Sequence, residues 1–200
     1  MNSLEIFQLQ QLVEKHPNIA AAAELLKKLK IVSVRGLHGS SRALFAIGVF
    51  HKNPRTALFV FNDQETAAYF YHDITQIIGS EDVLFFPSAY KRAAKYGQID
   101  SANEILRTET MSRLQNLHEP VLLISYPDAL AEKVVSKDIL TKNTLKLSVG
   151  EQVDSSFVSE VLDSFGFSFV DYVYEPGQYA TRGSILDVFS YSNELPFRID

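Results

Sequence analysis

The sequence contains no cysteine among its 200 residues. This absence excludes disulfide bonds, thiol nucleophiles and metal sites with cysteine ligands, and it is typical of proteins in a reducing cytosol. No apolar run approaches the roughly 20 residues that a membrane-spanning helix needs. Residues 1–17 have neither a basic start nor an apolar core, so we expect no signal peptide. We therefore expect a cytoplasmic globular protein that does not insert into a membrane.

The sequence also has no excess of basic residues. It contains 19 Lys and Arg against 24 Asp and Glu, which gives a net charge of −5. A domain that binds duplex DNA mainly through its phosphates is normally basic, so nucleic acid is not the expected partner of this chain. Hydrophobic residues make up 46% of the sequence, enough to form a core and to exclude a disordered chain.

Short apolar runs alternate with helical patterns in the first two thirds of the chain. Two helices are expected first, over residues 3–15 and 19–29. The apolar runs that follow lie at 31–34, 57–61, 83–86 and 121–124, and the helical patterns lie at 41–50, 62–78, 101–117 and 127–135. Runs that are apolar at every position are typical of strands buried on both faces of a parallel sheet. We expect an α/β domain over residues 1–143, with a mostly parallel sheet flanked by helices.

The pattern changes after Asn143, where we expect a smaller α+β domain with antiparallel strands over residues 144–200. Residues 144–149 alternate like a half-exposed strand, and a helix follows between Asp154 and Gly166. Residues 167–174 and 179–189 indicate an antiparallel hairpin around a turn at 175–178. The chain ends inside a further strand pattern at 197–200. We therefore expect a fragment that is truncated in or at the edge of its second domain.

The loop after the first expected strand resembles a degraded phosphate-binding loop. A P-loop requires Gly, four residues, and then Gly-Lys-Ser/Thr. Gly36 fits the first position, but Ser41, Arg42 and Ala43 occupy the last three, so close backbone approach, the lysine ammonium and the Mg²⁺-binding hydroxyl are all lost. Pattern alone leaves open a plain strand-to-helix turn or a decayed nucleotide site. The loop comprises Gly36, Gly39, Ser40, Ser41, Arg42 and Ala43.

Three segments together suggest a family. Residues 36–44, GLHGSSRAL, resemble the degenerate P-loop of the transcription-repair coupling factor (Mfd) family. Residues 175–189, EPGQYATRGSILDVF, resemble its GEYATRGxxLDxF stretch, and residues 195–200, LPFRID, resemble its LPxRxD segment. The resemblance covers about residues 30–200. It implies an N-terminal module similar to domains 1a and 2 of the excinuclease subunit UvrB, without ATPase activity or a cofactor.

The resemblance also implies a partner and the residues that bind it. In this family the second domain docks UvrA through arginines, which correspond to Arg182 and Arg198 here. The ATP-driven translocase, with its contacts to duplex DNA and RNA polymerase, is expected beyond Asp200, and this fragment is expected to be monomeric. Strand alternation predicts that Arg182 shares a face with Leu186 and Val188, unless Gly183 makes a bulge. The implied function is recruitment of UvrA to stalled RNA polymerase for nucleotide excision repair.

Two other readings remain. One is a UvrB-type, NTP-dependent helicase or excinuclease subunit, which the residues Arg42-Ala43 disfavour. The other is an α/β interaction domain without a role in repair, in which Arg182 and Arg198 are ordinary solvated strand residues. Three further features have a structural explanation that we favour over a functional one. We expect His38 to be solvated or bonded to the backbone and Asp63 to cap a helix. We expect Lys91, Arg92 and Lys95 to form a solvated basic cluster. The five histidines show no metal-ligand spacing.

Overall fold

The computed structural model describes residues 3–90, 100–193 and 195–200. The chain divides into two compact units, one made of residues 1–87 and 117–131 and the other of residues 88–116 and 132–200. The chain crosses from one unit to the other more than once, so each unit contains separated segments. A boundary between domains at residue 143 stays a prediction. In the described part of the chain, no helix is long and apolar enough to cross a membrane.

Helices α1 (Ser3–Glu14), α2 (Pro17–Lys28) and α3 (Ser41–Lys52) pack together in the first unit. Pro17 occupies the first turn of α2, where its missing N–H costs nothing, and the side chain of His16 caps that helix. Small residues bring α2 and α3 close together. A side chain added at Gly48 would come within 3.1 Å of Ile19, whose own side chain is buried. The glycine therefore sets the distance between the two helices.

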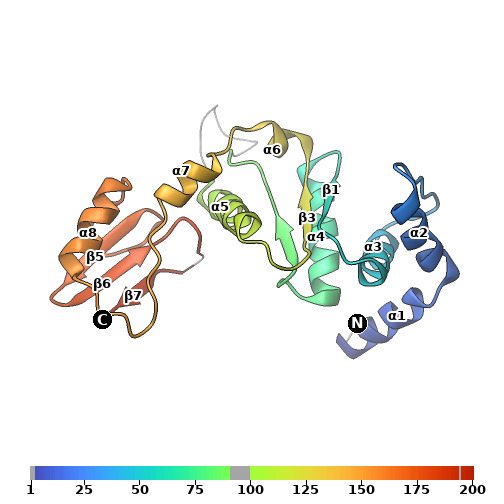
Figure 1. Ribbon diagram of the computed structural model, residues 1–200, viewed down its shortest axis with the longest axis horizontal. Coiled ribbons are helices and arrows are strands. Elements are labelled where there is room, and N and C mark those ends of the chain that lie inside the picture. Colours follow the sequence, from blue (N-terminus) through green and yellow to red (C-terminus); the bar gives the residue numbers. More distant parts are fainter. Residues whose placement is uncertain (1–2, 91–99, 194) are drawn as a thin grey trace. The chain divides into compact units, whose positions relative to one another are not determined.

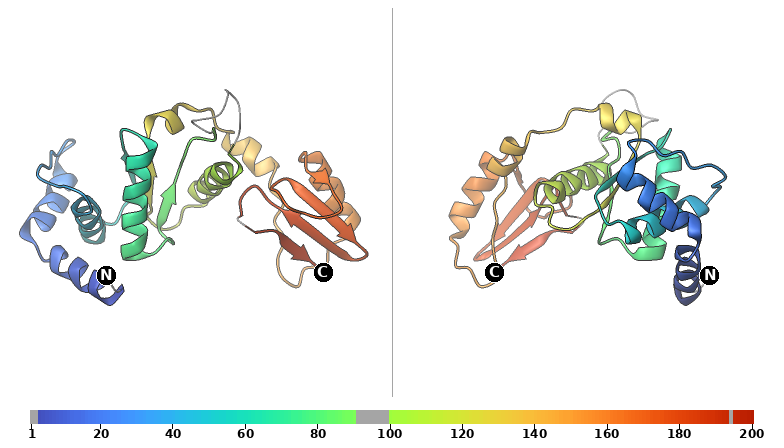
Figure 2. Two further views of the ribbon diagram at one scale, coloured as in Figure 1. Left: turned by 180° about the vertical axis from the view of Figure 1, so that it is seen from behind. Right: turned by 45° about the vertical axis from the view of Figure 1, so that its right-hand side comes forward.

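The first unit also contains a three-stranded parallel sheet, and helix α4 (Gln64–Ile78) lies between this sheet and helices α1 and α3 (Figures 1 and 2). Its order is β1 (Ala57–Val60), β3 (Leu122–Ser125) and β2 (Val83–Phe85). Helix α4 packs on the sheet through Phe70, whose ring centroid lies 5.1 Å from that of Phe59 and 4.6 Å from that of Phe61. The short helix α6 (Pro127–Ala131) follows β3. The expected parallel sheet with flanking helices is confirmed.

The sheet contains three of the four strands that the apolar runs predict. Residues 31–34 are not a strand, and Ile31 is 86% exposed. A strand needs a neighbour that accepts and donates its backbone hydrogen bonds, and among the described residues no strand lies beside this segment. Residues 144–149, also expected as a strand, are irregular for the same reason. A short apolar run indicates burial, but it does not supply a pairing partner.

Among the described residues, the helices of the second unit are α5 (Ser101–Gln115), α7 (Lys137–Lys142) and α8 (Ser155–Ser164). Asp100 caps α5, since its carboxylate accepts from the N–H groups of Ala102 and Asn103 at 3.2 and 3.5 Å. The sequence pattern places one helix over 127–135. The structure instead ends α6 at Ala131 and starts α7, which the pattern missed, at Lys137.

The second unit also contains a four-stranded mixed sheet (Figure 1). Its order is β4 (Ser168–Phe169), β5 (Gln178–Arg182), β6 (Ile185–Phe189) and β7 (Phe197–Ile199). Strand β4 runs parallel to β5, so the predicted antiparallel hairpin around 175–178 is wrong. The antiparallel hairpin is β5–β6, and its turn is Gly183-Ser184, with a φ of +65° at Gly183 that favours glycine.

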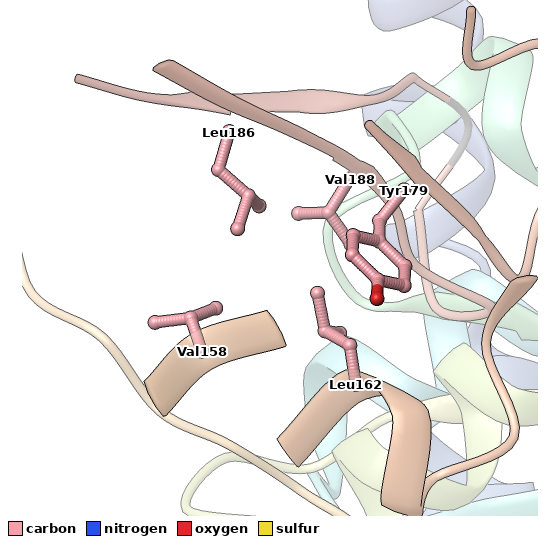
Figure 3. Packing of buried hydrophobic residues seen from close by; sticks show 5 residues of the cluster. All are labelled: Val158, Leu162, Tyr179, Leu186 and Val188. Atoms are coloured by element: carbon pink, nitrogen blue, oxygen red, sulfur yellow. The ribbon is translucent and has the colours of Figure 1, made fainter. Parts of the chain in front are cut away.

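Helix α8 covers one face of this sheet, called here the inner face. Figure 3 shows its core, in which two side chains of α8 point toward three strand residues: Val158, Leu162, Tyr179, Leu186 and Val188. As predicted, α8 begins at the cap Asp154, whose carboxylate accepts from the N–H of Ser156 at 2.8 Å. It ends before Gly166, which has a φ of +80°. The helix thereby fixes which face of the sheet is turned away from the core.

Candidate protein-docking surface

The strand register places both candidate arginines on the face of the sheet opposite α8, called here the outer face. Arg182 pairs with Ile185 and Thr181 pairs with Leu186 across the hairpin, while Arg198 pairs with Asp187. Residues paired directly across strands point to the same face. Since Leu186 is a core residue of the inner face, Arg182 lies on the other side. The prediction that Arg182 shares the face of Leu186 and Val188 is therefore wrong, because the two-residue turn shifts the alternation by one position.

Arg198 and Asp187 form a bidentate ion pair on the outer face. Nε of Arg198 donates to Oδ1 of Asp187 at 2.7 Å, and Nη2 donates to Oδ2 at 2.9 Å. The Arg198 side chain is 63% exposed and that of Asp187 only 17%. The hydrogen bond from Arg198 lowers the pKa of Asp187; partial burial opposes this, and the charges of Arg198 and Arg182 add to the lowering. Arg198 and Arg182 therefore both lie close enough to Asp187 to lower the pKa of the same carboxylate.

Arg182 is held by a different set of contacts. Its Nη2 donates to the backbone carbonyl of Asp171 at 2.9 Å, and its Cζ lies 4.4 Å from the ring centroid of Tyr172. This distance is typical of a cation–π contact. Among the described residues Arg182 makes no ion pair, so most of its N–H donors stay available to a partner.

The segment that carries Asp171 and Tyr172 is anchored at its far end. The side-chain oxygen of Gln178 accepts from the N–H groups of Tyr174 and Glu175 at 2.9 and 3.1 Å. Gly177 has a φ of +84°, and a side chain there would overlap the ring of Tyr191. These contacts fold residues 170–177 back beside the start of β5. Sequence reasoning missed Tyr172, because its approach to Arg182 depends on this connection between parallel strands rather than on local periodicity.

The loop at residues 36–43 does not have the surroundings of a phosphate-binding loop. It follows an irregular segment rather than a strand. Ala43, at the position of the Mg²⁺-binding hydroxyl, is fully buried. The Ser41 hydroxyl accepts from the N–H of His38 at 2.8 Å and donates to its carbonyl at 2.6 Å. Side chains added at Gly36 or Gly39 would meet no atom within 4 Å, so these glycines serve backbone conformation and do not mark a tight cradle.

The weaker sequence candidates have structural roles where the structure describes them. Asp63 caps α4 by accepting from the N–H of Thr66 at 2.8 Å, as predicted. His38 is exposed, and its backbone is bonded to Ser41. Lys91, Arg92 and Lys95 lie outside the described residues. No group of His, Asp or Glu in the described part of the chain is arranged to hold a metal ion.

A buried ion pair in the second unit was not predicted from the sequence. Arg107 of α5 is only 7% exposed, and its Nη1 lies 3.2 Å from Oε2 of Glu132. Glu132 also accepts from the hydroxyl of Ser88 and from the N–H of Ala89. The pair borders a pocket of about 410 Å³ whose wall includes Met111. Helical spacing could not indicate this ion pair, because Glu132 is far from Arg107 in the sequence.

Comparisons with known proteins agree with the motifs. Residues 145–200 match the model of the UvrB interaction domain. The chain is 26% identical to the transcription-repair-coupling factor of Escherichia coli K12 over 166 residues, which are 82% of this chain and 14% of that protein. It is 23% identical to the transcription-repair-coupling factor of Borreliella burgdorferi over 196 residues, 96% of this chain and 17% of that protein. It is also 25% identical to UvrABC system protein B of Ureaplasma parvum over 178 residues, 82% of this chain and 26% of that protein.

The chain therefore spans only about a seventh of the length of the first curated relatives it matches. The comparisons confirm the resemblance predicted from the motifs: the chain is similar to transcription-repair-coupling factors over most of its length, and it carries a match to the UvrB interaction domain at residues 145–200.

Proposed function

We propose that this chain is a non-catalytic docking module that binds UvrA and thereby brings nucleotide excision repair to stalled RNA polymerase. The observation that carries the proposal is the shared outer face of Arg182 and Arg198, within the residues that match the UvrB interaction domain. Helix α8 covers the inner face, whereas Arg182 and Arg198 are exposed on the outer face, where a partner can reach them.

The chemistry of the outer face suits a partner that presents carboxylates. Arginine pairs with carboxylates in bidentate geometry and is enriched among the residues that dominate binding energy at interfaces. Arg182 is held by one hydrogen bond to a carbonyl and by an aromatic ring, neither of which neutralises its charge. Arg198 is paired with Asp187, which fixes the direction of its guanidinium and lowers the entropy lost on binding.

The relatives are longer than this chain and contain segments outside these residues. We propose that ATP-driven translocation and the contacts with duplex DNA and RNA polymerase belong to such segments of a longer protein. The present chain would then supply the repair-recruiting surface. Its net charge of −5 agrees with a protein partner rather than with duplex DNA.

A UvrB-type enzymatic role is the second candidate, since UvrABC system protein B of Ureaplasma parvum is among the relatives. Such a role requires a nucleotide site. The buried Ala43 and the Ser41 hydroxyl bonded to His38 both disfavour nucleotide binding at residues 36–43. We therefore favour docking over catalysis.

A direct binding experiment tests the proposal. Purified UvrA is titrated into the 200-residue chain in a calorimeter near physiological salt, and the docking proposal expects saturable binding with one site per chain. Repeating the titration with UvrA from which nucleotide has been removed distinguishes a direct contact from one that needs ATP. Absence of binding under both conditions would remove the proposed function.

A further inference from the structure

The ring of Tyr172 forms a platform under the guanidinium of Arg182. Cζ of Arg182 lies 4.4 Å from the ring centroid, while Nη2 reaches past the ring to the carbonyl of Asp171. Tyr172 is 59% exposed and its neighbour Tyr174 is 77% exposed. The two tyrosine rings lie 6.4 Å apart. One cation and two aromatic rings therefore meet at one exposed corner of the second unit.

Such a platform affects binding through entropy. A free arginine side chain samples many rotamers, and fixing it at an interface costs conformational entropy. The Tyr172 ring and the Asp171 carbonyl both hold the guanidinium of Arg182 before any partner arrives. The segment itself is fixed in turn, because Gln178 holds Tyr174 and Gly177 packs beneath Tyr191.

We infer that Tyr172 is a positioning residue that orients Arg182 on the outer face to receive a carboxylate of UvrA. The inference rests on the proposed function and deepens it. The ring lies against the guanidinium, and one Nη2 bond goes to the Asp171 carbonyl, so a partner carboxylate would accept from the N–H groups that remain. The partner chemistry that fits is a carboxylate for the N–H groups beside an apolar group that packs on Tyr174.

The arrangement favours an acidic partner over a phosphate of duplex DNA. Asp187, next to both arginines, keeps a lowered pKa and is therefore ionised at neutral pH. A single carboxylate can bind Arg182 without displacing Asp187, since Asp187 is already bonded to Arg198. A continuous phosphate backbone would instead have to pass close to that negative charge.

Three substitutions at position 172 separate positioning from bulk. Tyr172→Phe keeps the aromatic face, Tyr172→Leu keeps apolar volume without it, and Tyr172→Ala removes both. Tyr69 of α4 is a matched control, because it is a tyrosine with 67% exposure in the first unit. We expect Tyr172→Ala and Tyr172→Leu to weaken UvrA binding about fivefold, in line with an exposed cation–π contact, while Tyr172→Phe and Tyr69→Ala leave it unchanged.

A double-mutant cycle and a structural readout complete the test. In an Arg182→Ala background, Tyr172→Leu should have no further effect, because its role acts through Arg182. Without UvrA, the side-chain δ protons of Arg182 should be shifted upfield in NMR spectra by the Tyr172 ring, and Tyr172→Leu should abolish that shift. Thermal unfolding of each variant shows whether it is folded.

The outcomes distinguish the inference from the function on which it rests. If Arg182→Ala weakens UvrA binding but folded Tyr172→Leu does not, docking stands and the positioning role is overturned. Equal additive losses in the cycle would also overturn it, since Tyr172 would then act independently. If the unmodified chain does not bind UvrA, both the proposed function and this inference fail.

Discussion

Arg198 on β7 and Asp187 on β6 face each other across directly paired strand positions and are joined by two hydrogen bonds of 2.7 and 2.9 Å. This geometry gives the pair two roles. It links the last strand to the hairpin, and it fixes a cation on the outer face close to Arg182. A partner that binds Arg198 must use the edge of the guanidinium that Asp187 leaves open, so the ion pair limits the direction of approach.

The first prediction concerns the two arginines. We expect Arg182→Ala and Arg198→Ala each to weaken UvrA binding about tenfold or more, because interface arginines commonly contribute about 2 kcal/mol. Calorimetric titration measures the effect, and Arg42→Ala, an exposed arginine of α3 in the other unit, serves as the control. Melting temperatures are compared in parallel, since Arg198→Ala also leaves Asp187 without its ion-pair partner. Unchanged affinity in both folded variants would remove the site assignment while leaving the family resemblance intact.

The second prediction concerns the titration of Asp187. Its pKa is lowered in the folded protein by the hydrogen bond from Arg198, so the folded state holds the carboxylate charged to lower pH than the unfolded state does. The stabilisation is therefore complete above the unfolded pKa of aspartate and is lost as the pH falls through the lower, folded value. NMR titration of the Asp187 side-chain carboxyl carbon should give a midpoint below the ordinary aspartate value, and Arg198→Ala should raise that midpoint. An equal midpoint in the two proteins would show that the pair is not maintained in solution.

The sequence predicted which segments form strands better than it predicted how those strands pair. The uniformly apolar runs at 57–61 and 121–124 contain strands β1 and β3. The central strand β3 is buried on both faces, as such runs predict, whereas Leu58 and Val60 of the edge strand β1 are 51% and 52% exposed. Residues 31–34 carry a similar run and are not a strand, since apolar character does not provide a hydrogen-bonding neighbour. Pairing is a property of distant segments, and a single local run carries no information about it.

The face of Arg182 illustrates the same limit at the candidate site. Alternation from Arg182 to Leu186 assumes an unbroken strand, yet Gly183-Ser184 is a two-residue turn that changes the register by one. The signal was present, because glycine followed by a small polar residue is typical of such turns. The contact between Tyr172 and Arg182 had no comparable signal, because it requires β4 and β5 to run parallel.

The third prediction concerns Tyr179, which links β5 to α8. Its hydroxyl donates to Oδ1 of Asp163 at 2.7 Å, and burial together with this carboxylate raises the pKa of Tyr179 to about 12. Since the folded pKa lies above the unfolded one, the neutral tyrosine contributes stability that is present below the unfolded pKa, near pH 10, and is lost as the pH rises towards 12. We expect Tyr179→Phe to cost about 1 kcal/mol at neutral pH and to reduce the alkaline loss of stability.

Urea unfolding at neutral and alkaline pH measures both effects of that substitution. Tyr174→Phe is the control, because Tyr174 is 77% exposed and lies on the same unit. A Tyr179→Phe protein with the stability of the unmodified chain at neutral pH, and with the same alkaline loss, would show that the bond to Asp163 does not hold α8 on the sheet.

The fourth prediction concerns nucleotide. We expect no saturable binding of ATP with Mg²⁺ at sub-millimolar concentrations, and no ATP hydrolysis above background. The reason is structural as well as chemical: Ala43 is buried in the core, Arg42 replaces the lysine, and the Ser41 hydroxyl is already bonded at both the N–H and the carbonyl of His38. Restoring the lysine and the hydroxyl of the motif should therefore not restore the site. In Arg42→Lys combined with Ala43→Ser, the new hydroxyl would be enclosed by the core and could not reach a metal ion, so we expect a less stable protein that still does not bind ATP.

Calorimetry measures ATP binding in the unmodified and the doubly substituted protein, and thermal unfolding measures the cost of the buried hydroxyl. Binding by the unmodified chain would favour the UvrB-type alternative over docking alone, whereas binding only by the doubly substituted protein would show that residues 36–43 keep the backbone of a working P-loop.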